Sequence, residues 1–162
     1  MSGTAKLKEI LALKPAIVGI GNTLRGDDGA GVELVERLIA HGYHNALIVF
    51  SNPENYLQKI AAMPGGARLW IDIINWNAAP GSFRIFSSGE IGQFAISTHN
   101  FSAEVLVEFL SNLKDVPDYF LGIQPEKLTL GEGLSKPVAD ALERLFRILI
   151  SAVEPENREA SE

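Results

Sequence analysis

The sequence contains no cysteine, and this absence removes several kinds of chemistry. A chain without thiols cannot form a disulfide, bind a metal through thiolate or use a cysteine nucleophile. The strong metal ligands that remain are carboxylates and imidazoles, and the chain has only three histidines: His41, His44 and His99. Any metal site in this protein is therefore expected to be built from Asp, Glu and His.

A long apolar run and a run of basic residues are also missing. No apolar stretch reaches the ~20 residues that a membrane helix needs, and residues 1–14 lack the apolar segment and cleavage site of a signal peptide. Lys and Arg are scattered and the formal net charge is −6, unlike a general nucleic-acid or anionic-membrane binder. We expect a cytoplasmic monomer that neither binds nucleic acid nor inserts into a membrane.

The length and apolar content fit one domain. A chain of 162 residues, 46% of them hydrophobic, can fill a core between a sheet and two helix layers. We place a single α/β domain at residues 15–152, preceded by an N-terminal extension at 1–14 and followed by a polar C-terminal tail at 153–162.

Apolar periodicity predicts an alternation of strands and helices. The turn at Pro80-Gly81 leaves no room for a crossover, so the fourth strand is predicted to form an antiparallel hairpin with the third. The fold class is α/β: a three-layer α/β/α sandwich around a five-stranded, mostly parallel, twisted sheet with one antiparallel strand. The predicted strands are 16–20, 46–50, 68–74, 82–86 and 119–123, and the predicted helices are 29–39, 54–62, 101–113 and a last one capped by Ser135.

Polar residues follow or end several of these strands. Because ligands of open parallel sheets bind at the carboxyl ends of the strands, these residues are expected to converge on one edge. The chemically strongest set is Asp28 after the first strand, Asp72 within the third and His99 before the long helix. Two carboxylates and one imidazole suit a divalent transition metal and leave coordination positions open for water or substrate.

Each of these residues also has a purely structural interpretation. Asp27 and Asp28 precede a helix, where Asp commonly caps free N–H groups, and taken alone capping is favoured for either. His99 alone could equally be a hydrogen-bonded structural histidine. Asp72 lies among apolar strand residues, where a carboxylate is costly unless it is paired, hydrogen-bonded or metal-bound, so we favour a functional role for it.

The motifs, taken together, resemble those of the hydrogenase maturation endopeptidases. The resemblance runs over about residues 15–150 and is closest to the branch that processes formate-hydrogenlyase-type hydrogenases. Its segments, in order, are Gly19-Ile20-Gly21-Asn22-Thr23-Leu24-Arg25-Gly26-Asp27-Asp28-Gly29-Ala30-Gly31-Val32, Pro53-Glu54-Asn55, Asp72, Pro80-Gly81, Ser97-Thr98-His99-Asn100 and Leu121-Gly122-Ile123-Gln124-Pro125.

The resemblance implies an aspartic-type peptidase whose partner is a nickel–iron hydrogenase large-subunit precursor. The enzyme would remove a C-terminal extension from a precursor that already carries nickel, so the metal arrives with the substrate. It implies that Asp28, Asp72 and His99 contact this nickel and that Asp28 and Asp72 are the catalytic candidates. The supporting motif residues would be Gly21, Asn22, Gly26, Asp27, Glu54, Asn55 and Gln124.

Two questions stay open at this point. The nickel could act as a Lewis acid, or it could serve only for recognition while Asp28 or Asp72 acts as general base. The alternatives to the favoured function are a zinc-dependent hydrolase on the same fold, a nucleotide-binding module, and a chaperone that senses nickel loading without catalysis.

Overall fold

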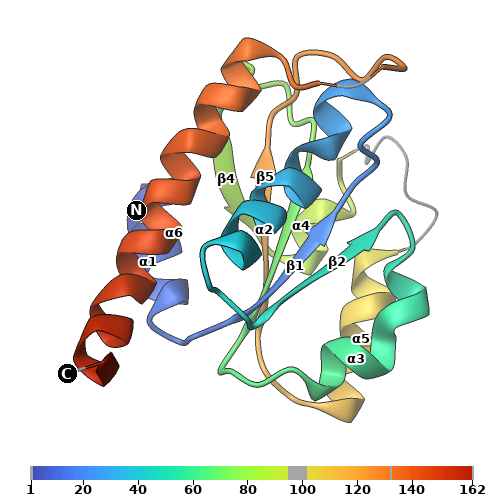
Figure 1. Ribbon diagram of the computed structural model, residues 1–162. Helices are drawn as coiled ribbons and strands as arrows, with labels where there is room; N and C mark the ends of the chain where they lie inside the picture. Colours follow the sequence, from blue (N-terminus) through green and yellow to red (C-terminus); the bar gives the residue numbers. More distant parts are fainter. Residues whose placement is uncertain (1, 95–101, 132, 162) are drawn as a thin grey trace.

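The computed structural model describes residues 2–94, 102–131 and 133–161. Five strands form one sheet in the order β2-β1-β3-β5-β4 (Figure 1). Four strands run parallel, and β4 runs antiparallel to its neighbour β5. The mostly parallel five-stranded sheet with one antiparallel strand is thus confirmed. The strand bounds are Ala16–Ile20 for β1, Ala46–Phe50 for β2, Arg68–Ile73 for β3, Phe83–Phe86 for β4 and Asp118–Ile123 for β5.

The hairpin predicted between the third and fourth strands does not form. β5 lies between β3 and β4 and pairs with both, so β4 has the predicted direction but a different neighbour. The physical reason is burial. β5 carries apolar side chains to both faces, such as Phe120 and Leu121, and an interior position covers them better than an edge would.

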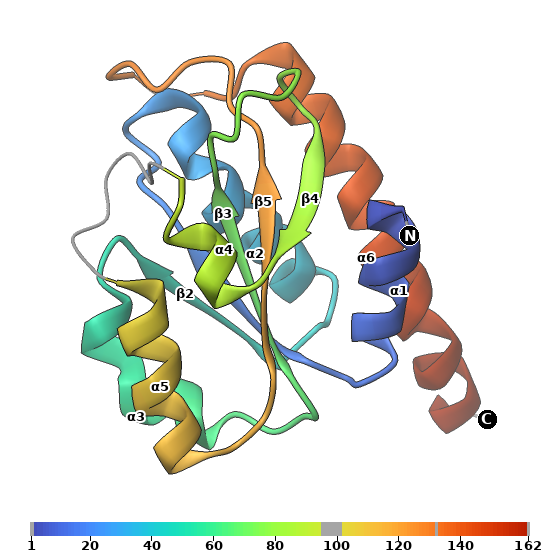
Figure 2. The ribbon, with the colours of Figure 1, turned by 180° about the vertical axis from the view of Figure 1, so that it is seen from behind.

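Helices cover both faces of the sheet, which confirms the three-layer arrangement. Helices α1 (Gly3–Leu11), α2 (Ala30–Ala40) and α6 (Lys136–Ser161) lie on one face. Helices α3 (Leu57–Ala62), α4 (Ser88–Ile91) and α5 (Ala103–Leu113) lie on the other, as seen from behind (Figure 2). No helix in the described parts of the chain combines the length and apolar character needed to cross a bilayer.

Each strand divides its side chains between two apolar clusters. In β3, Leu69 and Ile71 belong to the cluster under α1, α2 and α6, whereas Trp70 belongs to the cluster under α3, α4 and α5. This alternation is the two-residue period of a strand buried on both sides. It places the next residue in the series, Asp72, on the same face as Trp70.

Helix α1 was not predicted from the sequence. Ser2 caps it by accepting a hydrogen bond from the Ala5 N–H at 3.1 Å. Its buried side chains, Leu7 and Ile10, join the cluster formed with α2 and α6. Residues 3–11 are therefore packed onto the same core as the rest of the sheet.

A buried ion pair fixes the register of β3 and β5 at their amino ends. Arg68 lies opposite Asp118 and binds its carboxylate with two nitrogens, Nε at 2.7 Å and Nη2 at 2.9 Å. The Trp70 indole N–H donates to the same carboxylate at 2.8 Å. This network satisfies both charges far from the carboxyl ends of the strands, where the predicted site residues lie.

Candidate active site at the carboxyl ends of the strands

The loop after β1 turns back tightly on itself at Gly21. This residue has φ of +150°, and a Cβ there would lie 2.0 Å from the carbonyl oxygen of Asp28, so only glycine fits. The Asn22 N–H donates to the Asp28 carbonyl oxygen at 3.1 Å and to its carboxylate Oδ2 at 3.2 Å. The glycine thus lets the chain hold Asp28 against the end of the first strand.

A second close approach sets this loop against β3. A Cβ on Gly31, at the start of α2, would lie 2.3 Å from the Ile71 carbonyl oxygen and 2.5 Å from that of Ile20. The backbone of the helix start therefore rests directly on the ends of β1 and β3. Because Asp28 is three residues before Gly31 and Asp72 follows Ile71, the two aspartates lie at the same edge of the sheet, on adjacent segments.

Both aspartates are buried in this edge. Asp28 is 1% exposed and Asp72 is 3% exposed. The Asp72 carboxylate accepts a hydrogen bond from the N–H of Ile73 at 2.7 Å. Since β3 alternates, the Asp72 side chain lies on the face covered by α3, α4 and α5. A carboxylate buried at a strand end is costly unless hydrogen-bond donors or a cation compensate it, so each of these positions requires polar partners.

His99 lies outside the described residues, together with Ser97, Thr98 and Asn100. Within the parts of the chain that the structure describes, no group of three His, Asp or Glu side chains could hold a metal. The structure therefore brings together two of the three predicted ligands, Asp28 and Asp72. The contribution of His99 stays a prediction.

Asp27 has a different role from the capping that its position suggested. The chain already turns helical at residues Gly26–Gly29, and α2 has Gly29 at its N-cap without a side-chain cap. The Asp27 carboxylate, 0% exposed, instead accepts four hydrogen bonds. The donors are the N–H groups of Glu126, Lys127 and Ser135 and the Ser135 hydroxyl, at 2.7–2.9 Å.

This carboxylate fastens the loop between β5 and α6 to the loop after β1. In Figures 1 and 2 the two loops, orange and blue, lie side by side at the top of the molecule. Capping failed as an interpretation for Asp27 because its partners come from a segment about a hundred residues away. The nearest signal in the sequence was the pair of polar residues at the two ends of that loop, Gln124 and Ser135.

Gln124 holds a third loop at the same edge. Its side-chain oxygen accepts from the N–H groups of Trp76 and Ala78 at 2.9 and 3.2 Å, and its Nε2 donates to Asn75 Oδ1 at 2.9 Å. These bonds shape the connection from β3 to β4. Gln124 is therefore a structural support for the segment that follows Asp72.

Glu54 and Asn55 lie farther to the side. They are exposed in the turn after β2 and, with Phe109, line a shallow cavity of about 340 Å³ over α3 and α5. This cavity does not include Asp28 or Asp72 among its lining residues.

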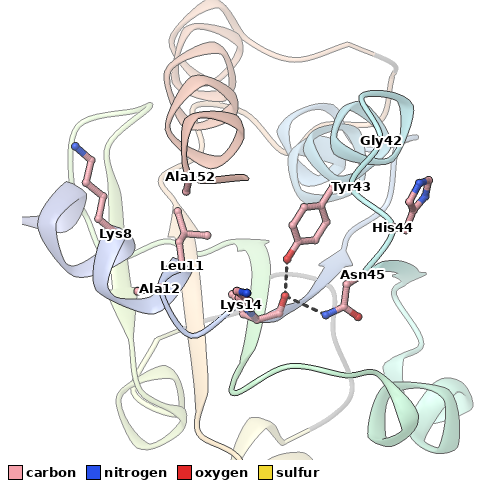
Figure 3. Close-up of a pocket in the computed structure, with 10 residues that line it drawn as sticks. Lys8, Leu11, Ala12, Lys14, Gly42, Tyr43, His44, Asn45 and Ala152 are labelled. Carbon is pink, nitrogen blue, oxygen red and sulfur yellow. Dashed lines mark hydrogen bonds between the residues drawn. The ribbon is translucent and has the colours of Figure 1, made fainter. Parts of the chain in front are cut away.

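A larger cavity, of about 500 Å³, lies at the opposite edge of the sheet (Figure 3). It is lined by Lys8 of α1, by Ala152 of α6 and by residues of the α1–β1 and α2–β2 connections, including Lys14 and His44. The Tyr43 hydroxyl and the Asn45 side chain both donate to the Pro15 carbonyl oxygen, at 2.6 and 3.3 Å. None of the predicted site residues lines it, so its size does not make it the active-site candidate.

Glu90, on the exposed surface of α4, has a perturbed carboxyl group. The pKa of Glu90 is lowered from its usual value, chiefly because the backbone N–H of Ser87 donates to it, with Arg84 adding to the effect. Glu90 and Ser87 form the capping box of α4. This shift reflects helix capping on an exposed surface.

Comparison with known proteins agrees with the motifs. A family model for hydrogenase maturation proteases, that of HycI, matches residues 52–152. The hydrogenase 3 maturation protease of Escherichia coli K12 is 31% identical over 134 residues, which is 80% of this chain and 85% of that protein.

Solved structures give the same result. The nickel–iron hydrogenase maturation protease HycI from Thermococcus kodakarensis KOD1 superimposes with a TM-score of 0.79 at 26% identity, covering 92% of this chain and 99% of that one. The endopeptidase HycI from Escherichia coli has a TM-score of 0.70 at 29% identity, covering 82% and 86%.

The fold and these neighbours place the chain in the class of α/β peptidases. It belongs to the family of hydrogenase maturation proteases, in the HycI branch that the sequence motifs had indicated. It is thus an enzyme, a peptide hydrolase that acts in hydrogenase maturation.

Proposed function

We propose that this peptidase removes a C-terminal extension from the large-subunit precursor of a nickel–iron hydrogenase after nickel has been inserted. The observation that carries the proposal is the pair of buried carboxylates, Asp28 and Asp72, held at one edge of the sheet by two separate close approaches of the backbone. Such a pair offers oxygen ligands to a metal that enters with the substrate.

Nickel is part of the substrate in this proposal, and Asp28, Asp72 and His99 complete its coordination during recognition. Two carboxylates and one imidazole are too few to fill the coordination shell, so positions stay open for ligands from the precursor. A precursor without nickel lacks the cation that would join it to these ligands, and it would bind poorly. The enzyme would in this way distinguish nickel-loaded precursor from nickel-free precursor before cleavage.

The same carboxylates can act on the peptide bond. A carboxylate beside the scissile bond can take a proton from the attacking water, while bound nickel can polarise a carbonyl as a Lewis acid. Asp72→Asn separates these roles. If Asp72 acts as general base, the variant still binds nickel-loaded precursor but does not cut it. If Asp72 is mainly a ligand, binding and cutting fall together.

The experiment that tests the function is incubation of the protein with nickel-loaded and nickel-free precursor, followed by intact mass measurement of the large subunit. We expect shortening of the loaded form only. Equal shortening of both forms would contradict recognition of nickel. Activity on small peptides, together with stoichiometric metal in the purified protein, would instead indicate a hydrolase with its own zinc.

We further infer that the protein works in the cytoplasm as a monomer and without nucleic acid. The scattered positive charge and the net charge of −6 support the absence of nucleic-acid binding. Sedimentation of the purified protein, alone and with precursor, measures the oligomeric state directly.

A further inference from the structure

Arg25 stands out at this edge because, within residues 2–94, 102–131 and 133–161, its guanidinium carries a buried donor and has no acidic partner. Among the described residues, its Nε is the only buried side-chain nitrogen or oxygen atom without a hydrogen bond. Other arginines are paired: Arg68 with Asp118, Arg37 with Glu143 and Arg84 with Glu90. Buried donors are almost always satisfied in native proteins, so a free one beside a candidate active site calls for a ligand.

The backbone holds Arg25 in a fixed position. Arg25 and Gly131 form an isolated bridge between the two loops. The Gly131 N–H donates to Leu24 O and the Gly26 N–H donates to Gly131 O, both at 2.8 Å. The Asp27 carboxylate anchors the next part of the same loop. The guanidinium is therefore carried on a braced segment, three residues before Asp28.

Two apolar side chains flank this cation. Leu24 is 55% exposed and Leu130 is 83% exposed, and the bridged backbone places them on neighbouring loops. These two exposed leucines offer apolar contact area beside the cation to a partner segment. A partner segment that fits this rim has a carboxylate next to apolar side chains.

We propose that Arg25 binds a carboxylate of the precursor and thereby positions its C-terminal segment over Asp28 and Asp72. The proposal rests on the proposed function, since it takes the precursor as the ligand. The carboxylate is either an Asp or Glu side chain near the cleaved bond or the C-terminal carboxylate of the extension. A planar guanidinium binds either one through two parallel hydrogen bonds. On a chain with net charge −6, a dedicated cation offsets the repulsion of an acidic segment.

The test compares wild type, Arg25→Ala and Arg25→Lys, with Arg147→Ala as the matched control. Arg147 is an arginine on α6 with a 77% exposed side chain, paired only with the exposed Glu143. We expect Arg25→Ala to raise the KM for nickel-loaded precursor at least tenfold with kcat changed less than twofold. Arg25→Lys should recover only part of the loss, because an ammonium cannot bind in the two-pronged manner. Arg147→Ala should match wild type.

Two sets of precursor variants identify which carboxylate binds Arg25. Acidic residues near the precursor's cleavage site are neutralised one at a time, and the C-terminal carboxylate is converted to an amide. The change that removes the partner should weaken processing by wild type and have no further effect with Arg25→Ala. Thermal unfolding of Arg25→Ala should be unchanged, because its Nε makes no internal hydrogen bond to lose.

The outcomes separate the two proposals. If wild type shortens the precursor and Arg25→Ala does so with the same KM, the role of Arg25 is overturned while the function stands. A loss that appears in kcat alone, or that couples to no precursor carboxylate, also overturns it. If wild type neither binds nor shortens the precursor, the proposed function fails and takes this inference with it.

Discussion

Asp27 and Ser135 are separated by 108 positions in the chain, yet the carboxylate of Asp27 accepts hydrogen bonds from both the backbone N–H and the hydroxyl of Ser135. The two distances are 2.7 and 2.8 Å. This contact joins the first motif, which carries Asp28, to the start of the last helix. The position of the catalytic candidate thus depends on a loop that is remote in sequence.

Replacing Asp27 by alanine should lower stability substantially. The change leaves the N–H groups of Glu126, Lys127 and Ser135 without their acceptor, and each unsatisfied buried donor costs about 1–3 kcal/mol. Because the loop can partly reach water, we expect a total of about 3 kcal/mol. Urea unfolding measures the loss. Asp27→Asn should cost less, since the amide keeps one acceptor oxygen. A variant as stable as wild type would show that the anchor contributes nothing.

Neutralising either buried aspartate of the pair should abolish processing without unfolding the protein. Asp28→Asn and Asp72→Asn keep side-chain volume but remove a charge, and loss of a general base typically lowers rates by about 10²- to 10⁴-fold. The readout is precursor shortening by intact mass, with circular dichroism to confirm folding. His99→Ala is predicted to behave in the same way. Full activity in any of these variants would remove that residue from the site.

Gly31→Ala should damage both stability and activity, although it adds only one methyl group. Its Cβ would lie 2.3 Å from the Ile71 carbonyl oxygen and 2.5 Å from that of Ile20, and backbone atoms cannot move aside easily. Lifting α2 from the sheet should cost about 1–3 kcal/mol and displace Asp28 from its place beside β3.

The control for this prediction is Gly89→Ala in α4. A Cβ there has its nearest neighbour, Glu104 Oε1, at 3.7 Å, which is an ordinary contact. Alanine in a helix should raise stability by about 0.5–1 kcal/mol. If Gly31→Ala were as stable and active as Gly89→Ala, the close packing of α2 on the strand ends would not matter for the site.

The strands of the sheet were largely predictable because short runs of neighbouring apolar residues determine them. Ala16–Ile20 is apolar throughout, and Arg68–Ile73 is apolar apart from Arg68 and Asp72, which is typical of strands covered on both faces. The neighbour of β4 was not predictable, because pairing with β5 instead of β3 depends on which strand needs the interior position. Helix α1 escaped notice because its apolar residues, Leu7, Ile10 and Leu11, are few and need α6 to be covered.

The site residues also differ in whether local sequence was enough to identify their role. Asp72 could be identified from sequence, since a carboxylate within an apolar strand requires a reason. The role of Asp27 could not be identified, because its four hydrogen-bond donors lie in the segment after β5, about a hundred residues further along the chain. Arg25 belonged to the recognised motif, but its missing partner becomes evident only when every neighbouring side chain has a position. A single residue that is unusual for its surroundings can thus be identified from the sequence. Its hydrogen-bond partners can be identified only from the structure.

The buried pair of Arg68 and Asp118 provides a test of stability that is separate from catalysis. Asp118→Ala leaves the Arg68 guanidinium buried and removes the acceptor of the Trp70 indole N–H. Breaking such a pair by removing one partner typically costs about 3–5 kcal/mol. We expect a loss of this size in urea unfolding, with a change in Trp70 fluorescence, because its hydrogen bond is lost.

The folded fraction of Asp118→Ala should still process precursor with a wild-type kcat at low temperature. The pair lies at the amino ends of β3 and β5, whereas Asp72 lies near the carboxyl end of β3, so the active-site edge keeps its own supports. A kcat that falls in proportion to stability would mean that the two ends of the sheet are coupled, and the active site would then depend on the whole of β3 instead of its carboxyl end.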